Sequence, residues 1–227
     1  MPNQLIHRMQ AKERKLFLAA CEPIELTLGA VVGEPTLELD YVYFPVDSFI
    51  SLVALVEGSP GIEVGMVGSE GMFGVQLALG VTASPYHALV QGAGMAHRLA
   101  ARNFLRQLDD SPRLREIINR YISALMAQNA SSAACLRFHE VLPRLARWLL
   151  MTQDRAHSET FAVTQEFLGY MLGIRRVSVS QAAGDLQRAG LIKYARGQIE
   201  ILDRGGLEGA ACTCYATESQ AYATALE

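Results

Sequence analysis

Residues 163–181, with the sequence VTQEFLGYMLGIRRVSVSQ, carry the side chains of this chain that are best suited to a chemical task. In the second half of the segment, one helical face would present Arg176, Val177, Ser178, Ser180 and Gln181. Guanidinium, hydroxyl and amide groups are the groups that hydrogen-bond to the edges of DNA bases. The segment therefore indicates a DNA-contacting surface, although an ordinary helical hairpin with a solvated polar face has the same pattern.

Two short helices joined by a tight turn would position these side chains. The first is predicted to begin at Thr164, whose hydroxyl can cap the opening turn, and Gln165 and Glu166 favour that end of the helix dipole. Gly173 follows where the turn needs a residue that tolerates positive φ, and a second helix is predicted from about Arg175. Apolar residues at helical spacing give both helices a buried face: Phe167, Leu168, Met171 and Leu172 in the first, and Val179, Ala182, Ala183 and Leu186 in the second. The segment thus predicts a helix-turn-helix.

A two-stranded wing is predicted after the second helix. Residues 191–195 and 198–202 alternate in the manner of strands around Arg196 and Gly197, as in a β-hairpin. The hairpin would place Lys193 and Arg196 close to DNA phosphates.

A β-rich domain is predicted ahead of this region. From Ile24 to about His97, short runs rich in β-branched and aromatic residues are separated by turn signals at residues 58–61, 68–71 and 92–94. This spacing is typical of a compact antiparallel barrel or sandwich. Residues 4–20 are predicted to form one short amphipathic helix before it.

A long helix from about Pro112 to beyond Asn129 is predicted to connect the two regions. Some of its residues step by four and three, as in a coiled-coil seam: Leu114, Ile118, Tyr121, Leu125, Gln128 and Ser132. Small residues at 130–134 would allow a second helix to approach closely. The pattern favours a homodimer, and packing of this helix on the chain's own β-rich domain is the alternative. A further helix over about residues 141–154 leads into the helix-turn-helix.

Charge is distributed unevenly along the 227 residues, whose formal net charge is −3. No Lys or Arg occurs between Lys15 and Arg98, whereas nine acidic residues do. Residues 143–208 carry nine basic and seven acidic groups, a balance of about +2. Two modules are therefore indicated, and only the second is suited to a phosphate backbone.

The four cysteines, at positions 21, 135, 212 and 214, form no C-x-x-C motif and are too few for a disulfide framework. Cys212 and Cys214 stand near a C-terminus that is expected to be loose, and no histidine near them in sequence completes a ligand set. Neither a metal site nor a cofactor is predicted, and a redox role for this pair stays open. No apolar run approaches the roughly 20 residues of a membrane span, so the chain is expected to be cytoplasmic and to have no membrane partner.

The order of β-rich domain, long helix, helix-turn-helix and wing resembles that of the Crp/Fnr superfamily of bacterial transcription regulators. The resemblance is most specific over residues 145–202, through ARWLL, VTQEFLGYMLGIRRVSVSQAAGDLQRAGLI and RGQIEIL. It implies an α+β fold with an N-terminal antiparallel β-barrel of the double-stranded β-helix or jelly-roll type, a long dimerisation helix and a C-terminal winged helix-turn-helix. The implied domains are a cyclic-nucleotide-binding-like sensor at residues 1–110, a dimerisation helix and hinge at 111–140, a DNA-binding domain at 141–210 and a tail at 211–227.

The resemblance also implies roles for single residues. Arg176 matches the family's arginine that contacts guanine, which a bidentate guanidinium can do through O6 and N7. Arg175, Ser178 and either Thr164 or Gln165 fall where family members touch phosphates. Val177 replaces a common base-contacting glutamate, and Gln181 replaces an arginine of the best-known member. An altered operator is therefore expected, with one guanine retained in each half-site.

The sensor departs further from members that bind cyclic nucleotides. Those members use a Gly-Glu-Leu segment for the ribose and an Arg-Ser pair for the phosphate, whereas residues 74–76 and 84–87 here offer neither glutamate nor arginine. A phosphate buried without a cation would carry a large desolvation cost. Conventional cyclic AMP binding is not expected, and an N-terminal cysteine cluster for iron–sulfur chemistry is absent. Haem ligation by His87 or His97 stays open, and the effector, if one exists, is unidentified.

The sequence thus predicts a homodimeric regulator that binds palindromic promoter sites in double-stranded DNA and has a degenerate effector domain. A contact with RNA polymerase stays open. The alternative is a ligand-binding or protein-interaction module with little DNA affinity. An enzyme is not predicted, because no nucleophile–base set, paired carboxylates, phosphate loop or metal-ligand spacing stands out.

Overall fold

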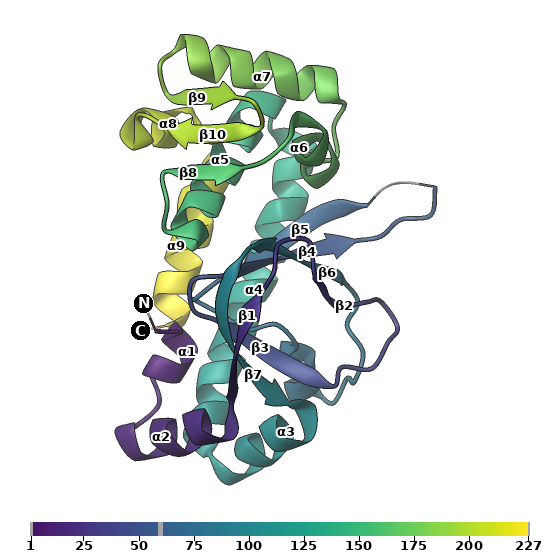
Figure 1. Cartoon of the computed structure of the whole chain (residues 1–227), viewed down its shortest axis with the longest axis vertical. Coiled ribbons are helices and arrows are strands. Elements are labelled where there is room, and N and C mark those ends of the chain that lie inside the picture. The colour runs from purple at the N-terminus through teal and green to yellow at the C-terminus, as the bar shows by residue number, and fades with distance from the viewer. Residues whose placement is uncertain (1, 59–60, 227) are drawn as a thin grey trace.

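The computed structural model describes residues 2–58 and 61–226, so residues 59 and 60 of the predicted turn at 58–61 lie outside the described part. The first half of the chain contains α1 (Gln4–His7), α2 (Ala11–Ala20), β1 (Glu22–Leu26), β2 (Val31–Gly33), β3 (Tyr41–Pro45), β4 (Phe49–Ala54), β5 (Ile62–Val67), the 3-10 helix η1 (Val75–Leu79), β6 (His87–Gly92), β7 (Gly94–Ala100) and α3 (Ala101–Asp110). The second half contains α4 (Pro112–Phe138), α5 (Val141–Ala156), β8 (Thr160–Ala162), α6 (Gln165–Leu172), α7 (Arg176–Arg188), β9 (Ile192–Ala195), β10 (Gln198–Ile201), α8 (Arg204–Ala210) and α9 (Cys214–Ala225). The predicted α+β fold is confirmed (Figure 1).

Residues 22–100, here called the β-domain, fold into two antiparallel sheets. Among the described strands the sheet orders are β1-β7-β3 and β2-β6-β4-β5. Side chains from both sheets, such as Phe44, Ile50, Val90 and Leu99, belong to one hydrophobic core. Two sheets that close over a shared core agree with the predicted jelly-roll architecture.

The N-terminal segment forms two helices and not the single helix predicted over residues 4–20. The Asn3 side chain caps α1 by accepting from the Leu5 and Ile6 amides, and it donates to the Pro45 carbonyl at 2.9 Å. Met9, between the helices, is buried in the core of the β-domain. The chain bends here because burying Met9 is favoured over continuing the helix.

The structure corrects the dimer seam predicted on the long helix, because most of that face is buried within the chain itself. Leu114, Ile118 and Tyr121 belong to the core of the β-domain, and the Tyr121 hydroxyl donates to the Met72 carbonyl at 3.1 Å. Gln128 and Ser132 are also buried. A helix that packs on its own domain buries the same stripe of residues as a coiled coil, so spacing alone did not distinguish the two.

The C-terminal segment was expected to be loose, but it forms the helix α9. This helix packs along α4, and Figure 1 shows it beside that helix. Tyr222 and Leu226 join the hydrophobic core that contains Leu5, and Glu218 is buried. The C-terminal helix is therefore part of the packed structure.

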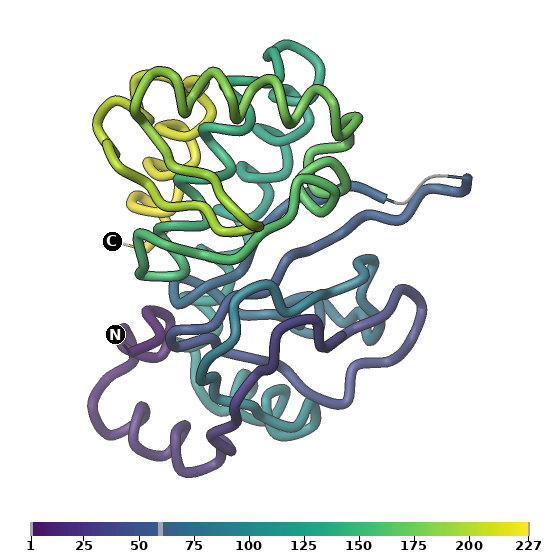
Figure 2. The backbone as a smooth tube through the Cα atoms, turned by 45° about the horizontal axis from the view of Figure 1, so that its top comes forward, coloured from purple at the N-terminus to yellow at the C-terminus, as the bar shows by residue number. Residues whose placement is uncertain are grey.

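Residues 141–210, here called the winged-helix domain, have a second core. It contains Leu145, Trp148 and Leu186 together with Val53 and Met66 from β4 and β5. The winged-helix domain consequently packs directly on the β-domain (Figure 2). Among the described residues, no helix is both long and apolar enough to cross a membrane.

Candidate DNA-binding surface

The helix-turn-helix forms as its local sequence predicts. Thr164 is the N-cap of α6, and its Oγ1 accepts a hydrogen bond from the Phe167 amide at 3.1 Å. Gly173 ends α6 with φ of 62°, and α7 begins at Arg176 with Arg175 as its N-cap. The predicted inward residues of α7 are buried: Val179, Ala182, Ala183 and Leu186. Burial of this stripe turns the opposite face of α7 outward.

Most of the candidate DNA-contacting residues of α7 lie on that outward face. Arg175, Arg176, Ser180 and Gln181 are exposed, and Ser178 is half-buried. Val177 is 66 % exposed. Ser180 Oγ donates to Gln165 Oε1 at 2.5 Å, so these two candidates hold one another in place.

The wing is part of a sheet with strand order β8-β10-β9, and the sequence pattern had indicated only two of these strands. Arg196 and Gly197 form the tip of the β9–β10 hairpin with φ of 52° and 75°. Positive φ at both central residues is the turn geometry that matches the twist of paired strands. Arg196 is exposed at this tip, whereas Lys193 is 3.6 Å from Glu200 of the neighbouring strand.

A cleft between α6, α7 and the wing collects four of the predicted residues. Thr164, Gln165, Arg176 and Arg196 line it. Val177, Gln181 and Lys193 lie outside it on the described surface. Two arginines from separate elements thus face one open concavity, where the wing and α7 could hold adjacent parts of a DNA backbone.

Tyr194 also lines this cleft, and the sequence pattern did not single it out. Its hydroxyl donates to the Val163 carbonyl at 2.8 Å, which links the wing to the start of the helix-turn-helix. Burial raises the pKa of Tyr194, and the charge of Arg176 partly opposes that shift. The strand alternation could have marked it, because Tyr194 stands two residues after the buried Ile192.

The turn of the helix-turn-helix rests on the β-domain. A Cβ atom on Gly173 would lie 2.6 Å from Ile62 Cδ1, so the end of the Ile62 side chain would have to move. Ile62 opens β5, the strand that also contacts α6. Glycine is favoured at position 173 chiefly by its positive φ, and this close approach adds to that preference.

A buried carboxylate joins the same two domains. Glu63 Oε1 accepts from the Trp148 indole at 3.0 Å, and Glu63 Oε2 accepts from Ser51 Oγ at 2.5 Å. Glu63 as a whole residue is half-buried, and the enclosure of its carboxyl group raises its pKa to about 7. Hydrogen bonds from Ser51 and Trp148 oppose the shift.

The segments compared with cyclic-nucleotide contacts engage other partners. His87 Nδ1 lies 2.8 Å from Glu34 Oε2, and Ser84 Oγ accepts from the Tyr86 amide. Arg98, the first arginine after the acidic stretch, lies 2.6 Å from Glu22 Oε2. The absence of conventional cyclic AMP binding, expected from the sequence, stays a prediction.

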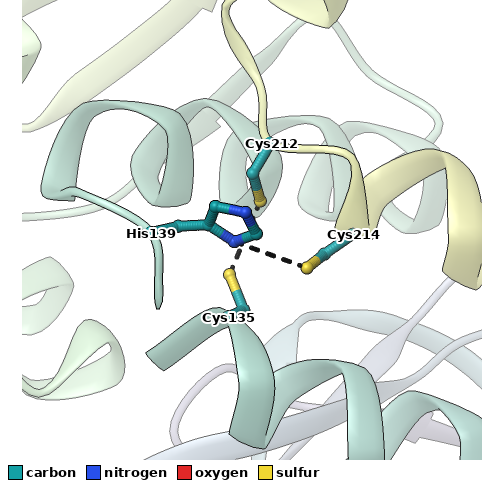
Figure 3. A group of neighbouring side chains, drawn as sticks. All are labelled: Cys135, His139, Cys212 and Cys214. Atoms are coloured by element: carbon teal, nitrogen blue, oxygen red, sulfur yellow. Dashed lines mark hydrogen bonds between the residues drawn. The ribbon is translucent and has the colours of Figure 1, made fainter. Parts of the chain in front are cut away.

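Cys212 and Cys214 have no histidine near them in sequence, but the fold brings one to them, which corrects the expectation that no ligand set is complete. His139 and Cys135, at the end of α4, meet these two cysteines (Figure 3). Hydrogen bonds from the Cys135 side chain and from the Cys214 backbone lower the pKa of Cys212 to about 5. The two pairs are more than 70 residues apart in sequence, so local spacing gave no signal of their contact.

Residues 143–210 match the family model of the Crp-like helix-turn-helix domain. The fold is similar to that of FixK2 from Bradyrhizobium japonicum, at 14 % identity over 85 % of this chain and 98 % of that chain, with a TM-score of 0.71. It is also similar to the c-di-GMP-responsive global regulator CLP of Xanthomonas campestris, at 16 % identity over 85 % and 99 % of the two chains (TM-score 0.67). A third similar structure is TTHB099, a Crp-family regulator from Thermus thermophilus, at 23 % identity over 83 % and 96 % (TM-score 0.65). No curated protein matches the chain.

A Crp-like winged helix-turn-helix that packs on a β-domain supports a DNA-binding transcription regulator. Regulators of this kind are not enzymes, in agreement with the sequence prediction. Residues 143–210 are thus a Crp-like helix-turn-helix domain, in agreement with the resemblance to the Crp/Fnr superfamily drawn from the motifs.

Proposed function

We propose that this protein is a sequence-specific regulator that binds palindromic promoter sites as a homodimer. α7 of each subunit would enter the major groove, and the two copies would lie about 34 Å apart, one turn of the duplex. The proposed DNA contacts are the residues predicted from the sequence: Thr164, Gln165, Arg175, Arg176, Val177, Ser178, Ser180, Gln181, Lys193 and Arg196.

The observation that carries this proposal is the shared cleft of Arg176 and Arg196. Arg176 stands in the first turn of α7, the part of a recognition helix that points into the groove. Arg196, at the wing tip, is placed to hold the backbone beside it. Exposed Val177 is suited to a thymine methyl, because an apolar side chain gains little by facing water.

The homodimer is supported by the face of α4 that points away from the chain's own core. Met126 is 69 % exposed there. Five small residues are exposed beside it: Ser123, Ala127, Ala130, Ala133 and Ala134. The exposed residues nearer the ends of the helix are larger and include Glu116, Arg120 and Phe138. A stripe of small residues around an apolar side chain allows two helices to approach closely, and a second copy of α4 supplies a matching stripe.

The effector role of the β-domain would act through the joint with the winged-helix domain. Ile62 lies against Gly173, and Glu63 accepts a hydrogen bond from Trp148. A displacement of β5 would therefore move the turn that aims α7. We assign residues 1–110 to the sensor, 111–140 to the dimerisation helix and hinge, and 141–210 to DNA binding, with no effector and no polymerase-contacting residue assigned.

Selection of binding sites from a random duplex library, followed by gel shifts over a salt series, tests the proposal. The selected site should be a palindrome with one essential guanine per half-site. Arg176→Ala should weaken binding by about 1–3 kcal/mol and relax the preference at that base pair.

Arg106→Ala, which removes an exposed arginine of α3, is the control and should leave the affinity unchanged. If the wild type and Arg176→Ala bind all duplexes equally and weakly, the regulator is excluded. That result would favour the second candidate, a ligand-binding or protein-interaction module with little DNA affinity.

A further inference from the structure

We propose that Cys135, His139, Cys212 and Cys214 form a structural zinc site that ties the end of α4 to the start of α9. The site is independent of DNA binding and of any effector in the β-domain. It would hold the joint at which the long helix passes into the winged-helix domain.

The four side chains are spaced as ligands of one tetrahedral ion. Each offers one ligand atom, and all four atoms lie within 4.8 Å of one another. Cys135 Sγ is 3.5 Å from Cys212 Sγ, and Cys214 Sγ is 3.6 Å from His139 Nδ1. With Zn–S near 2.3 Å and Zn–N near 2.0–2.1 Å, tetrahedral ligand atoms are about 3.5–3.8 Å apart. Little movement is needed to place an ion at their centre.

The donor set selects the kind of metal. Three thiolates and one imidazole form one of the common structural zinc sets, whereas magnesium and calcium require oxygen ligands. A closed set of four protein ligands leaves no position for substrate, so the ion would serve structure and not catalysis.

Both halves of the site are held rigidly by local structure. Cys135 lies in the last turn of α4 and His139 is its C-cap, so one helical turn separates them on the same face. Cys212 and Cys214 flank Thr213, the N-cap of α9. The Cys212 amide also donates to the Pro143 carbonyl of α5 at 3.3 Å. Three helices therefore converge on the four side chains (Figure 3).

Burial and charge also favour a metal over simple packing. The three thiols are buried, yet they form a small cluster separate from both hydrophobic cores. A zinc ion with three thiolates and a neutral imidazole carries a net charge of −1. Arg144 and Arg147 line the same crevice as Cys135 and supply positive charge beside it.

The position of the site gives it a mechanical role. α4 ends at Phe138 and α5 begins at Val141, so the site spans the short connection between the long helix and the winged-helix domain. Four coordinate bonds at this connection would limit the orientations of α7 relative to α4. An ion here would thereby set the spacing of the two recognition helices in a dimer.

The test is the metal content of the full chain, purified without a polyhistidine tag and under reducing conditions. Elemental analysis should find about one zinc per chain. After removal of zinc by a chelator under denaturing conditions, refolding with Co²⁺ should give the intense visible absorption of tetrahedral cobalt thiolate. Added zinc should then abolish that absorption.

Substitutions of the proposed ligands test whether the ion is bound at this cluster. Cys214→Ser and His139→Ala should each lose most of the bound zinc and the cobalt spectrum. Cys21→Ser is the matched control, because Cys21 is a half-buried thiol far along the chain from the cluster, and it should retain full metal content. Circular dichroism establishes whether each variant is folded. If a variant does not fold, the cobalt titration of the wild type still decides the matter.

Two results would overturn the proposal. Wild-type protein that contains no zinc and gives no cobalt–thiolate absorption has no metal site. A Cys135–Cys212 disulfide found by mass spectrometry after purification under reducing conditions would instead show that these two cysteines form a stable covalent bond and do not bind an ion. Neither result bears on DNA binding, so failure of the zinc site is distinguishable from failure of the proposed function.

Discussion

Arg147 Nη2 donates to Glu218 Oε2 at 2.7 Å, and this ion pair ties the last helix, α9, to α5. Glu218 is buried and Arg147 is largely enclosed, with 5 % and 11 % of their side-chain surfaces exposed. Gln128 of α4 donates to the other Glu218 oxygen at 2.5 Å, and Arg155 Nη2 lies 3.7 Å from it. One carboxylate thus joins α4, α5 and α9.

Glu218→Gln should lower the free energy of unfolding by about 3 kcal/mol or more, because it leaves the buried Arg147 without a counter-charge. Urea denaturation at neutral pH measures the loss. The control is Glu208→Gln, which removes an exposed ion pair with Arg204 and should cost less than about 1 kcal/mol. Equal losses in the two variants would contradict a structural role for the buried pair.

The carboxylate of Glu63 should make stability depend on pH. Burial raises its pKa in the folded protein to about 7 from an ordinary value of 4.5. A raised folded-state pKa contributes stability that is fully present below pH 4.5 and is lost as the pH rises through 7. Glu63→Gln removes this loss, so the stability difference between wild type and variant should change by about 2 kcal/mol between pH 5 and pH 8. Urea denaturation at both pH values measures it, and a difference that does not change with pH would contradict this account.

Alanine substitutions at two glycines with positive φ distinguish the cost of backbone strain from the cost of disturbing the contact between the domains. Gly173 and Gly190 have φ of 62° and 73°. A Cβ atom at position 173 would contact Ile62, whereas a Cβ atom at position 190 would have nothing within 4 Å. Gly190→Ala should cost about 1–2 kcal/mol from strain alone. Gly173→Ala should cost more, because the Ile62 side chain must also turn away from the added methyl group. Thermal denaturation of the two variants provides the comparison, and equal costs would mean that the joint adapts freely.

The exposed face of α4 predicts how the dimer can be broken. Ala130→Glu places a negative charge in the middle of the proposed interface. The same glutamate of the second subunit would lie close to it across the two-fold axis, so the two charges would repel. Light scattering during gel filtration should then report a monomer at concentrations where the wild type is dimeric. Ala223→Glu, on the exposed side of α9, is the control and should stay dimeric. A wild type that is monomeric at all concentrations would remove the homodimer from the proposed function.

The helix-turn-helix was predictable because its determinants are local. The Thr164 cap, the positive φ of Gly173 and the buried stripe of α7 each depend on residues within one or two helical turns. The β9–β10 hairpin is equally local, since Arg196 and Gly197 alone set its turn. β8 was missed because it pairs with β10 across more than 30 residues.

The sequence by itself determined the helix-turn-helix, the β9–β10 hairpin and the side chains that α7 presents outward, since short-range sterics, capping and periodicity decide these features. The tertiary structure alone decided what the apolar stripe of α4 packs against, where α9 lies and how Glu218 reaches Arg147. It also brought Cys135 and His139 to Cys212 and Cys214. Such contacts arise when apolar faces far apart in the chain are buried together, and the periodicity of one segment does not specify its partner.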